Sequence, residues 1–254
     1  NMNALFTLSS SAWQAYTKQH QCKYKLWSAD EVDTLIQLEA PEWLRLLYNS
    51  VRFPVQRVDV CRFFIIYKYG GLYADLDVFP NLATFPLVPL GMCKMKARDT
   101  PTMRHAHEWE IEVLVGKAGD SRLMEIMKGM LRALTEKWDL RYYDDKPCRF
   151  IFRTTGPKAV LKTMREAGYE PHVTVFSMCR PVPGLENHLS LDNEGRVCCH
   201  LPGLEQYDVW SAFSMSYNVS NPGPLPPLAP PLARLPPFAM PKMRPRYNVK
   251  TTPD

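Results

Sequence analysis

The sequence predicts an α/β fold with a mixed, mostly parallel central sheet, and three observations support this prediction. Strand-like apolar runs alternate with helix-like periodic segments over roughly 200 residues, which is typical of βα units. With 254 residues, 46% of them hydrophobic, the chain can bury a substantial core. Asn221–Pro245 holds ten of the 23 prolines, which disfavour helices and central strands. We therefore expect the α/β domain over residues 1–215 and an extended Pro-rich tail over residues 216–254.

The first third of the chain begins with short elements and leads to one long helix. Ser28, followed three residues later by Glu31, forms the capping box of a helix. Pro54 opens a longer helix in which apolar residues recur every three or four positions, and Gly70-Gly71 ends it. The next run is rich in β-branched and aromatic residues, which favours a strand. In order, we expect a strand at 4–8, a helix after Ser9–Ser11, a strand at 22–27, helices at 28–38, 41–48 and 54–69, and a strand at 72–79.

The rest of the chain continues the alternation. Ser121–Lys137 has the clearest amphipathic helix pattern, with apolar residues on one side. Phe150-Ile151-Phe152, followed by Gly156-Pro157, has the composition of a strand and a turn. In order, we expect strands at 90–96 and 109–115, a helix at 121–137, a strand at 150–152, a helix at 158–167, and strands at 173–178 and 197–201.

Unusual residues concentrate in one segment, Arg57–Pro80, which reads RVDVCRFFIIYKYGGLYADLDVFP. Asp59 and Arg62 are three apart on the predicted helix, so both lie on one face and can present an acceptor and a charged donor to a ligand together. The two glycines after the helix allow left-handed backbone and a tight reversal. The segment therefore combines a polar helix face with a sharp turn into the following strand.

That strand carries Asp75 and Asp77, whose side chains would point the same way at positions i and i+2. Two like charges on an apolar strand call for a cation, and hard oxygen ligands suit Mn²⁺ or Mg²⁺. The alternative is that both carboxylates sit at a strand end and are simply solvated. Because Asp59, Arg62 and the glycine turn occur in the same segment, we favour a metal site over two solvated carboxylates.

The whole segment resembles the sugar-binding DXD region of a glycosyltransferase family. That family includes the yeast initiating mannosyltransferases, the inositol-phosphoceramide mannosyltransferases and the large glucosylating toxins. An Asp and Arg three apart, a Tyr-Gly-Gly turn and a Tyr-x-Asp-x-Asp strand recur there in this order. Weaker similarities are Trp13, Tyr24–Trp27 and Thr155-Gly156-Pro157. The resemblance implies a GT-A fold, in which a Rossmann-like nucleotide half joins an acceptor half, and transfer with retention of anomeric configuration.

The resemblance also implies roles for individual residues. Asp59 and Arg62 would contact the ribose and sugar of the donor, and Tyr73 would line its pocket. Asp75 would face ribose, sugar or metal-bound water, and Asp77 would bind the metal directly. Asp75, Asp77 and Arg62 are thus the expected catalytic residues.

A second part of the expected site lies downstream, in Cys198–Gln206. Related retaining enzymes often have a His-x-x-Gly-x-x-Lys here, in which the imidazole is a third metal ligand and the glycine approaches the diphosphate. His200 and Gly203 fit this pattern, so the expected metal ligands are Asp75, Asp77 and His200. Gln206 stands in place of the lysine, so the positive charge beside the phosphates would have to come from elsewhere, such as Arg62 or the tail.

Other candidates have weaker patterns. His105, His107 and Glu108 could form a second metal cluster, although a solvated or acceptor-binding loop fits these residues better. Glu112 precedes Val-Leu-Val-Gly at a place where relatives often have Asn, and it could touch the donor or acceptor sugar.

Composition limits the kinds of binding partner and the cellular compartment that we expect for the protein. A net charge of +5 with scattered Lys and Arg does not indicate a nucleic-acid interface. The seven cysteines include no CxxC pair, which argues against a disulfide scaffold and slightly favours a reducing compartment. We find no membrane-spanning run or signal peptide, so we expect a soluble, cytoplasmic chain. The alternative is the Golgi lumen, with an anchor absent from this sequence.

The sequence therefore predicts a metal-dependent retaining glycosyltransferase. It would move a hexose from a nucleoside-diphosphate sugar, UDP-linked in preference to GDP-linked, to a hydroxyl of a glycan, lipid or protein, with Mn²⁺ or Mg²⁺ as cofactor. Two alternatives are a catalytically inactive module that binds sugar nucleotides or proteins, and a metal-dependent phosphotransferase. The donor sugar, the acceptor and the oligomeric state stay open.

Overall fold

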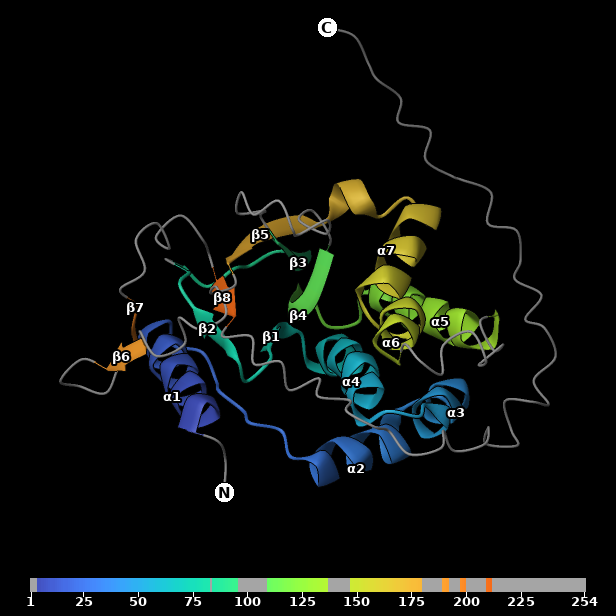
Figure 1. Ribbon diagram of the computed structural model, residues 1–254, viewed down its shortest axis with the longest axis horizontal. Helices are drawn as coiled ribbons and strands as arrows, with labels where there is room; N and C mark the ends of the chain where they lie inside the picture. Colours follow the sequence, from blue (N-terminus) through green and yellow to red (C-terminus); the bar gives the residue numbers. More distant parts are fainter. Residues whose placement is uncertain are drawn as a thin grey trace, which may run out of the picture.

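The computed structural model of the protein describes residues 4–82, 84–95, 109–136, 147–179, 189–191, 197–199 and 209–211. These ranges form an α/β fold (Figure 1). The helices are α1 Ala4–Gln19, α2 Ala29–Glu39, α3 Glu42–Ser50, α4 Pro54–Tyr69, α5 Ser121–Glu136, α6 Pro147–Thr154 and α7 Pro157–Glu166, with a 3₁₀ turn at Glu170–His172. The strands are β1 Gly71–Ala74, β2 Val78–Pro80, β3 Leu90–Met95, β4 Trp109–Gly116, β5 Thr174–Cys179, β6 Leu189–Leu191, β7 Val197–Cys199 and β8 Val209–Ser211.

The main sheet has six strands in the order β1-β4-β3-β5-β8-β2, and β6 and β7 pair separately. β3 with β5 and β5 with β8 are parallel, whereas β1 with β4, β3 with β4 and β2 with β8 are antiparallel. The predicted α/β fold with a mixed sheet is confirmed. The sheet is not mostly parallel as predicted: only two of the five pairings between its described strands are parallel, because β4 runs opposite to both β1 and β3, and β2 runs opposite to β8.

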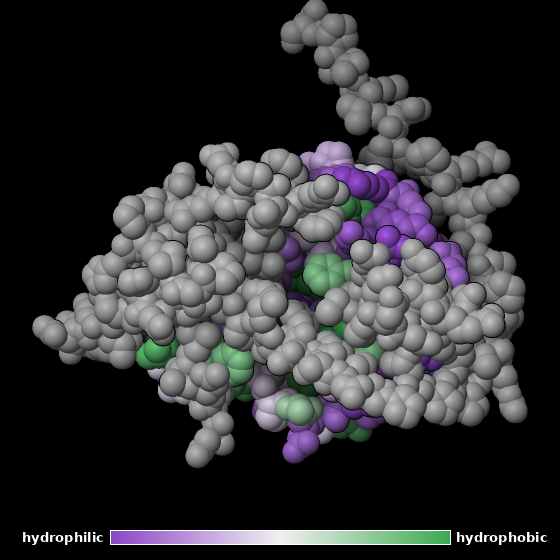
Figure 2. Space-filling view, viewed as in Figure 1, coloured by the Kyte–Doolittle hydropathy of each residue, from purple (hydrophilic) through white to green (hydrophobic). Residues whose placement is uncertain are grey.

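Helices cover the two faces of this sheet unequally. The larger core lies where α4 and α7 pack on β4 and α5 packs against both helices, and its fully buried side chains include Phe63, Leu114 and Ile126. A smaller cluster, which contains Trp13 and Phe176, lies under α1. Figure 1 shows α4–α7 grouped on one side of the strands and α1 on the other, beside β2. Over α7 the described surface is largely hydrophilic in Figure 2.

Predicted elements with a strong local signal are confirmed. Ser28 caps α2, where its hydroxyl accepts from the amide of Glu31 (3.2 Å) and the Glu31 carboxylate accepts from the amide of Ser28 (2.9 Å). The helices expected from Pro54 and Ser121 are α4 and α5, and the strands expected near 90, 109, 173 and 197 are β3, β4, β5 and β7. Local patterns sufficed for these elements. The expected tail, 216–254, lies outside the described residues.

Three short predicted strands are wrong. Residues 4–8 belong to α1, because the helix places Ser9 and Trp13 one turn apart, and both donate to the carbonyl of Val78 at 2.7 Å. Residues 22–27 form no strand. Residues 150–152 lie in α6, where Phe150 and Ile151 are both buried against the core. Tertiary packing overrides weak local preference in the two segments that became helices.

The run expected as one strand, 72–79, is two strands separated by a turn at residues 75–77. The amide of Asp75 donates to the carbonyl of Glu112 on β4 (2.9 Å), and the amide of Val78 donates back to the carbonyl of Asp75 (3.0 Å). β1 and β2 stand at opposite ends of the strand order, yet only three residues join them. The two ends of the sheet therefore meet at this turn.

The reversal before β1 depends on Gly70 and Gly71, whose φ angles are +67° and +94°. A Cβ on Gly70 would lie 2.9 Å from the amide nitrogen of Ala118, whereas a Cβ on Gly71 would meet nothing within 4 Å. We expect Gly71→Ala to lower the free energy of unfolding by about 1–2 kcal/mol through backbone strain alone. Gly70→Ala should cost clearly more, because strain and a backbone clash add.

Urea denaturation of the two variants measures this difference. Equal losses for Gly70→Ala and Gly71→Ala would contradict it. Gly119→Ala is the matched control for backbone strain without a clash, because Gly119 has φ +75° and a Cβ placed on it would meet nothing within 4 Å.

Candidate functional site

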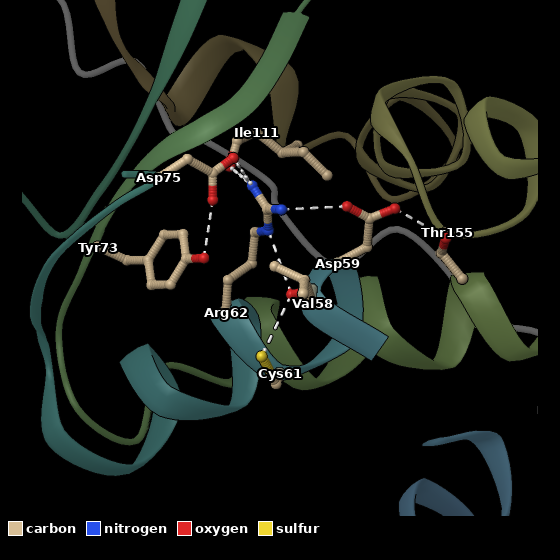
Figure 3. Close-up of polar contacts among 8 residues, drawn as sticks. All are labelled: Val58, Asp59, Cys61, Arg62, Tyr73, Asp75, Ile111 and Thr155. Atoms are coloured by element: carbon tan, nitrogen blue, oxygen red, sulfur yellow. Dashed lines mark hydrogen bonds and ion pairs between the residues drawn. The ribbon is translucent and has the colours of Figure 1, made fainter. Parts of the chain in front are cut away.

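Arg62 lies at the centre of a buried polar cluster between α4, β4 and the turn after β1 (Figure 3). Its side chain is only 3% exposed. Nε donates to the carbonyl of Val58 (3.3 Å), and Nη1 donates to the carbonyl of Ile111 (2.7 Å) and to Oδ2 of Asp75 (3.0 Å). Nη2 donates to Oδ1 of Asp59 (3.2 Å). The guanidinium thus joins two carboxylates and two backbone carbonyls.

Asp59 lies one helical turn before Arg62, on the same face of α4, as its spacing predicted. Its second oxygen, Oδ2, accepts a hydrogen bond from Oγ1 of Thr155 (2.9 Å), a fully buried residue between α6 and α7. Burial raises the pKa of Asp59 from 3.8 to about 6, although Arg62 and the Thr155 hydroxyl oppose this shift. Both oxygens of this carboxylate are therefore held within the protein.

Tyr73 and Asp75 complete the cluster on the side of the sheet. The Tyr73 hydroxyl donates to Oδ1 of Asp75 (2.8 Å), and the guanidinium carbon of Arg62 lies 5.2 Å from the centre of the Tyr73 ring. Burial, followed by the charge of Asp75, raises the pKa of the Tyr73 phenol well above its usual range, so it stays a proton donor at neutral pH. Asp75 is held on both oxygens, although its side chain remains 20% exposed.

An irregularity in β4 presents its backbone to this cluster. Met92 of β3 pairs with Leu114, but the next residue, Cys93, pairs with Glu110, so residues 111–113 are extra on the β4 side. Such bulges bend a strand and re-aim its groups. The carbonyl of Ile111 accepts a hydrogen bond from Arg62, and the carbonyl of Glu112 accepts one from the amide of Asp75.

The structure brings together four of the residues expected from the sequence, namely Asp59, Arg62, Tyr73 and Asp75. Asp77 is half-buried in the same turn. The expected geometry for Asp75 and Asp77 is wrong, because the two residues lie in a turn and not on one strand. The repulsion on Asp75 is relieved by Arg62, a cation that the protein supplies itself.

The downstream candidates lie outside the described residues: His105, His107, Glu108, His200, Gly203 and Gln206. Glu112 is described, and its side chain is buried on β4. Sequence reasoning missed the carbonyl of Ile111 and gave Thr155 no role. A backbone acceptor has no sequence signature, but the Thr-Gly-Pro similarity at Thr155 was a signal that could have been used.

The turn fits part of a divalent metal site. Its two carboxylates are hard oxygen ligands, and Mg²⁺ or Mn²⁺ is commonly held by one or two carboxylates while phosphates and water complete the shell. Within the described ranges, no three His, Cys, Asp or Glu side chains are grouped so that they could hold an ion. Asp75 and Asp77 therefore suit an ion that is bound together with a phosphate ligand.

Fold and site together define an α/β protein with a carboxylate-bearing turn fixed to a buried arginine. Residues 8–89 match the family described as "Glycosyltransferase sugar-binding region containing DXD motif". This match confirms the resemblance seen in the Arg57–Pro80 segment and extends it over residues 8–89.

Two curated proteins illustrate the similarity. Inositol phosphoceramide mannosyltransferase 3 of Schizosaccharomyces pombe is 41% identical over 66 residues, which is 26% of this chain and 18% of that protein. Mannosyl phosphorylinositol ceramide synthase CSH1 of Saccharomyces cerevisiae is 43% identical over 54 residues, 21% of this chain and 14% of that protein. The matched stretches thus span less than a fifth of the length of either relative.

Among solved structures, PaToxG glycosyltransferase aligns with 66% of this chain and 64% of its own, at a TM-score of 0.40 and 11% identity. This similarity is too low to add to the argument. None of the helices in the described residues is both long and apolar enough to cross a membrane.

The raised pKa of Asp59 gives a test of the cluster by pH. The folded state binds this proton more tightly than the unfolded state, so the contribution of Asp59 to stability falls as pH rises from about 4 to about 6. We expect the unmodified chain to lose stability relative to Asp59→Asn across this interval, and the difference to be constant above it. Melting temperatures of both proteins at half-unit pH steps measure this, and parallel pH profiles would show that Asp59 titrates normally.

Proposed function

We propose that the protein transfers a hexose, mannose in the first instance, from a nucleoside-diphosphate sugar to a hydroxyl acceptor. The observation that carries this proposal is the match of residues 8–89 to a glycosyltransferase sugar-binding region, with the Asp59–Arg62–Tyr73–Asp75 cluster inside it. Mannose is favoured because both relatives described above are named for mannosyl transfer. The GT-A arrangement and retention of anomeric configuration belong to the same proposal.

The turn between β1 and β2 would carry the reaction. Asp77, together with Asp75, would hold a divalent ion, which supplies positive charge beside the leaving diphosphate. Arg62 and Tyr73 keep the Asp75 carboxylate in one orientation, so little reorganisation is needed when the donor binds. On this turn Asp77 is half-buried and the side chain of Asp75 is 20% exposed, so a donor could reach both carboxylates.

Asp77→Asn tests the metal role of the turn. Amide substitution keeps the size of the side chain but removes the charge that would bind the ion, so donor turnover with Mn²⁺ should fall by at least about 100-fold, a loss of roughly 3 kcal/mol of transition-state stabilisation. Asp30→Asn is the matched control, because Asp30 is an exposed residue on α2. Steady-state hydrolysis or transfer with GDP-mannose and UDP-hexoses measures the effect. Full activity of Asp77→Asn would remove Asp77 from the mechanism.

The donor itself can be identified by ligand-linked stabilisation. We expect one nucleoside-diphosphate sugar to raise the melting temperature in the presence of Mn²⁺, because a donor at 100 times its Kd stabilises a protein by about 2.7 kcal/mol. A thermal-shift panel of GDP-mannose, UDP-glucose, UDP-galactose and UDP-N-acetylglucosamine, with and without Mn²⁺, measures this. The sequence favours a UDP-sugar, and the named relatives favour mannose. A shift that does not depend on the metal would contradict the proposed role of Asp75 and Asp77.

A further inference from the structure

A continuous chain of buried polar contacts links the junction of α6 and α7 to the turn after β1. Oγ1 of Thr155 donates to Oδ2 of Asp59, and Oδ1 of Asp59 accepts from Nη2 of Arg62. Nη1 of Arg62 then donates to Oδ2 of Asp75. Thr155 and Asp75 are 80 positions apart in sequence, yet three successive hydrogen bonds join their side chains (Figure 3).

The middle of this chain has little capacity left for a ligand. A guanidinium carries five N–H donors, and four acceptors inside the protein already engage Arg62: the carbonyls of Val58 and Ile111 and the carboxylates of Asp59 and Asp75. Arg62 is 2% exposed. Its geometry is that of a residue that orients a neighbour, and Asp75 is the neighbour at the surface.

Asp59 is likewise buried between two partners inside the protein. One of its oxygens faces Arg62 and the other faces Thr155, and the residue is 4% exposed. Without the Thr155 hydroxyl, Oδ2 would lose the hydrogen bond that sets the rotation of the carboxylate. Oδ1 would then be free to move relative to Nη2 of Arg62, and the orientation of the guanidinium toward Asp75 would weaken.

We propose that Thr155 is a positioning residue of the donor site and acts on Asp75 through Asp59 and Arg62. This inference rests on the proposed function, because Asp75 is taken as part of the metal and donor site. It gives Asp59 and Arg62 an orienting role on the turn in addition to the contacts with ribose and sugar that the family resemblance suggested.

The chain offers a matched control at the adjacent residue. Thr154 is as fully buried as Thr155. Its Oγ1 accepts from Nε2 of Gln56 (2.9 Å) and donates to the carbonyl of Phe150 (2.8 Å). Gln56 in turn accepts from the amides of residues 52 and 53, just before α4, and none of these contacts leads to Asp59. Thr154→Val therefore removes a comparable buried hydroxyl without touching the chain of contacts to Asp75.

The experiment compares Thr155→Val, Thr155→Ser and Thr154→Val in the full chain. The readouts are melting temperature, kcat and KM for the best donor, and calorimetric affinity for the corresponding nucleoside diphosphate with Mn²⁺. Both valine variants should melt lower by similar amounts. Only Thr155→Val should lose nucleotide affinity and kcat/KM, on the order of tenfold, as expected for one hydrogen bond to a charged group. Thr155→Ser keeps the hydroxyl and should restore both.

The possible results separate the hypotheses. Equal kinetic and binding effects of Thr155→Val and Thr154→Val, or none for Thr155→Val, overturn the positioning role while the proposed function stands. Absence of both turnover and nucleotide binding in the unmodified chain overturns the proposed function, and this inference with it. If a valine variant does not fold, Thr155→Ala and Thr154→Ala give the same comparison.

Discussion

The structure depends most on how the buried charge of Arg62 is compensated. A guanidinium removed from water is tolerated only when its donors and its charge are matched, and loss of one partner of a buried ion pair typically costs about 3–5 kcal/mol. Here α4 supplies Asp59, the turn after β1 supplies Asp75, and the bulge of β4 supplies the carbonyl of Ile111. The helix, the turn and the bulge are each needed to satisfy this one side chain.

That constraint also explains why two aspartates can stand so close together. Asp75 is paired with Arg62 and held by Tyr73, so the protein itself compensates part of its charge. Asp77, two residues further along the turn, stands beside a paired carboxylate and not beside a bare one. The turn can therefore persist without a metal, and under the proposed function it would offer oxygen ligands to a cation that is bound together with a phosphate group. A site of this kind is preorganised by its own protein, which lowers the cost of binding.

The sequence predicts those parts of the fold and site that rest on local rules. The capping box of Ser28 and Glu31 fixes α2, and the spacing of Asp59 and Arg62 fixes their common face on α4. It fails where distant contacts decide. The chain turns after Asp75, where the amide of Val78 donates back to the carbonyl of Asp75, and the residues that follow pair with β8. No pattern within residues 72–79 encodes that pairing. Residues 150–152 look like a strand in isolation, yet they form a helix because their apolar side chains pack into the core next to α5 and α7.

A buried ionic cluster of this kind is weak evidence for stability, since well-packed apolar residues of similar volume often stabilise a core as well or better. Asp59 is an example: burial raises its pKa to about 6, which means that keeping its charged form in the core costs free energy. What this costly cluster achieves is a fixed orientation of Asp75, which Arg62 holds and which reaches the surface. Perturbed titratable groups gather at functional sites for this reason. The arrangement is therefore better explained by the donor site that we propose at Asp75 and Asp77 than by the stability of the core beneath them.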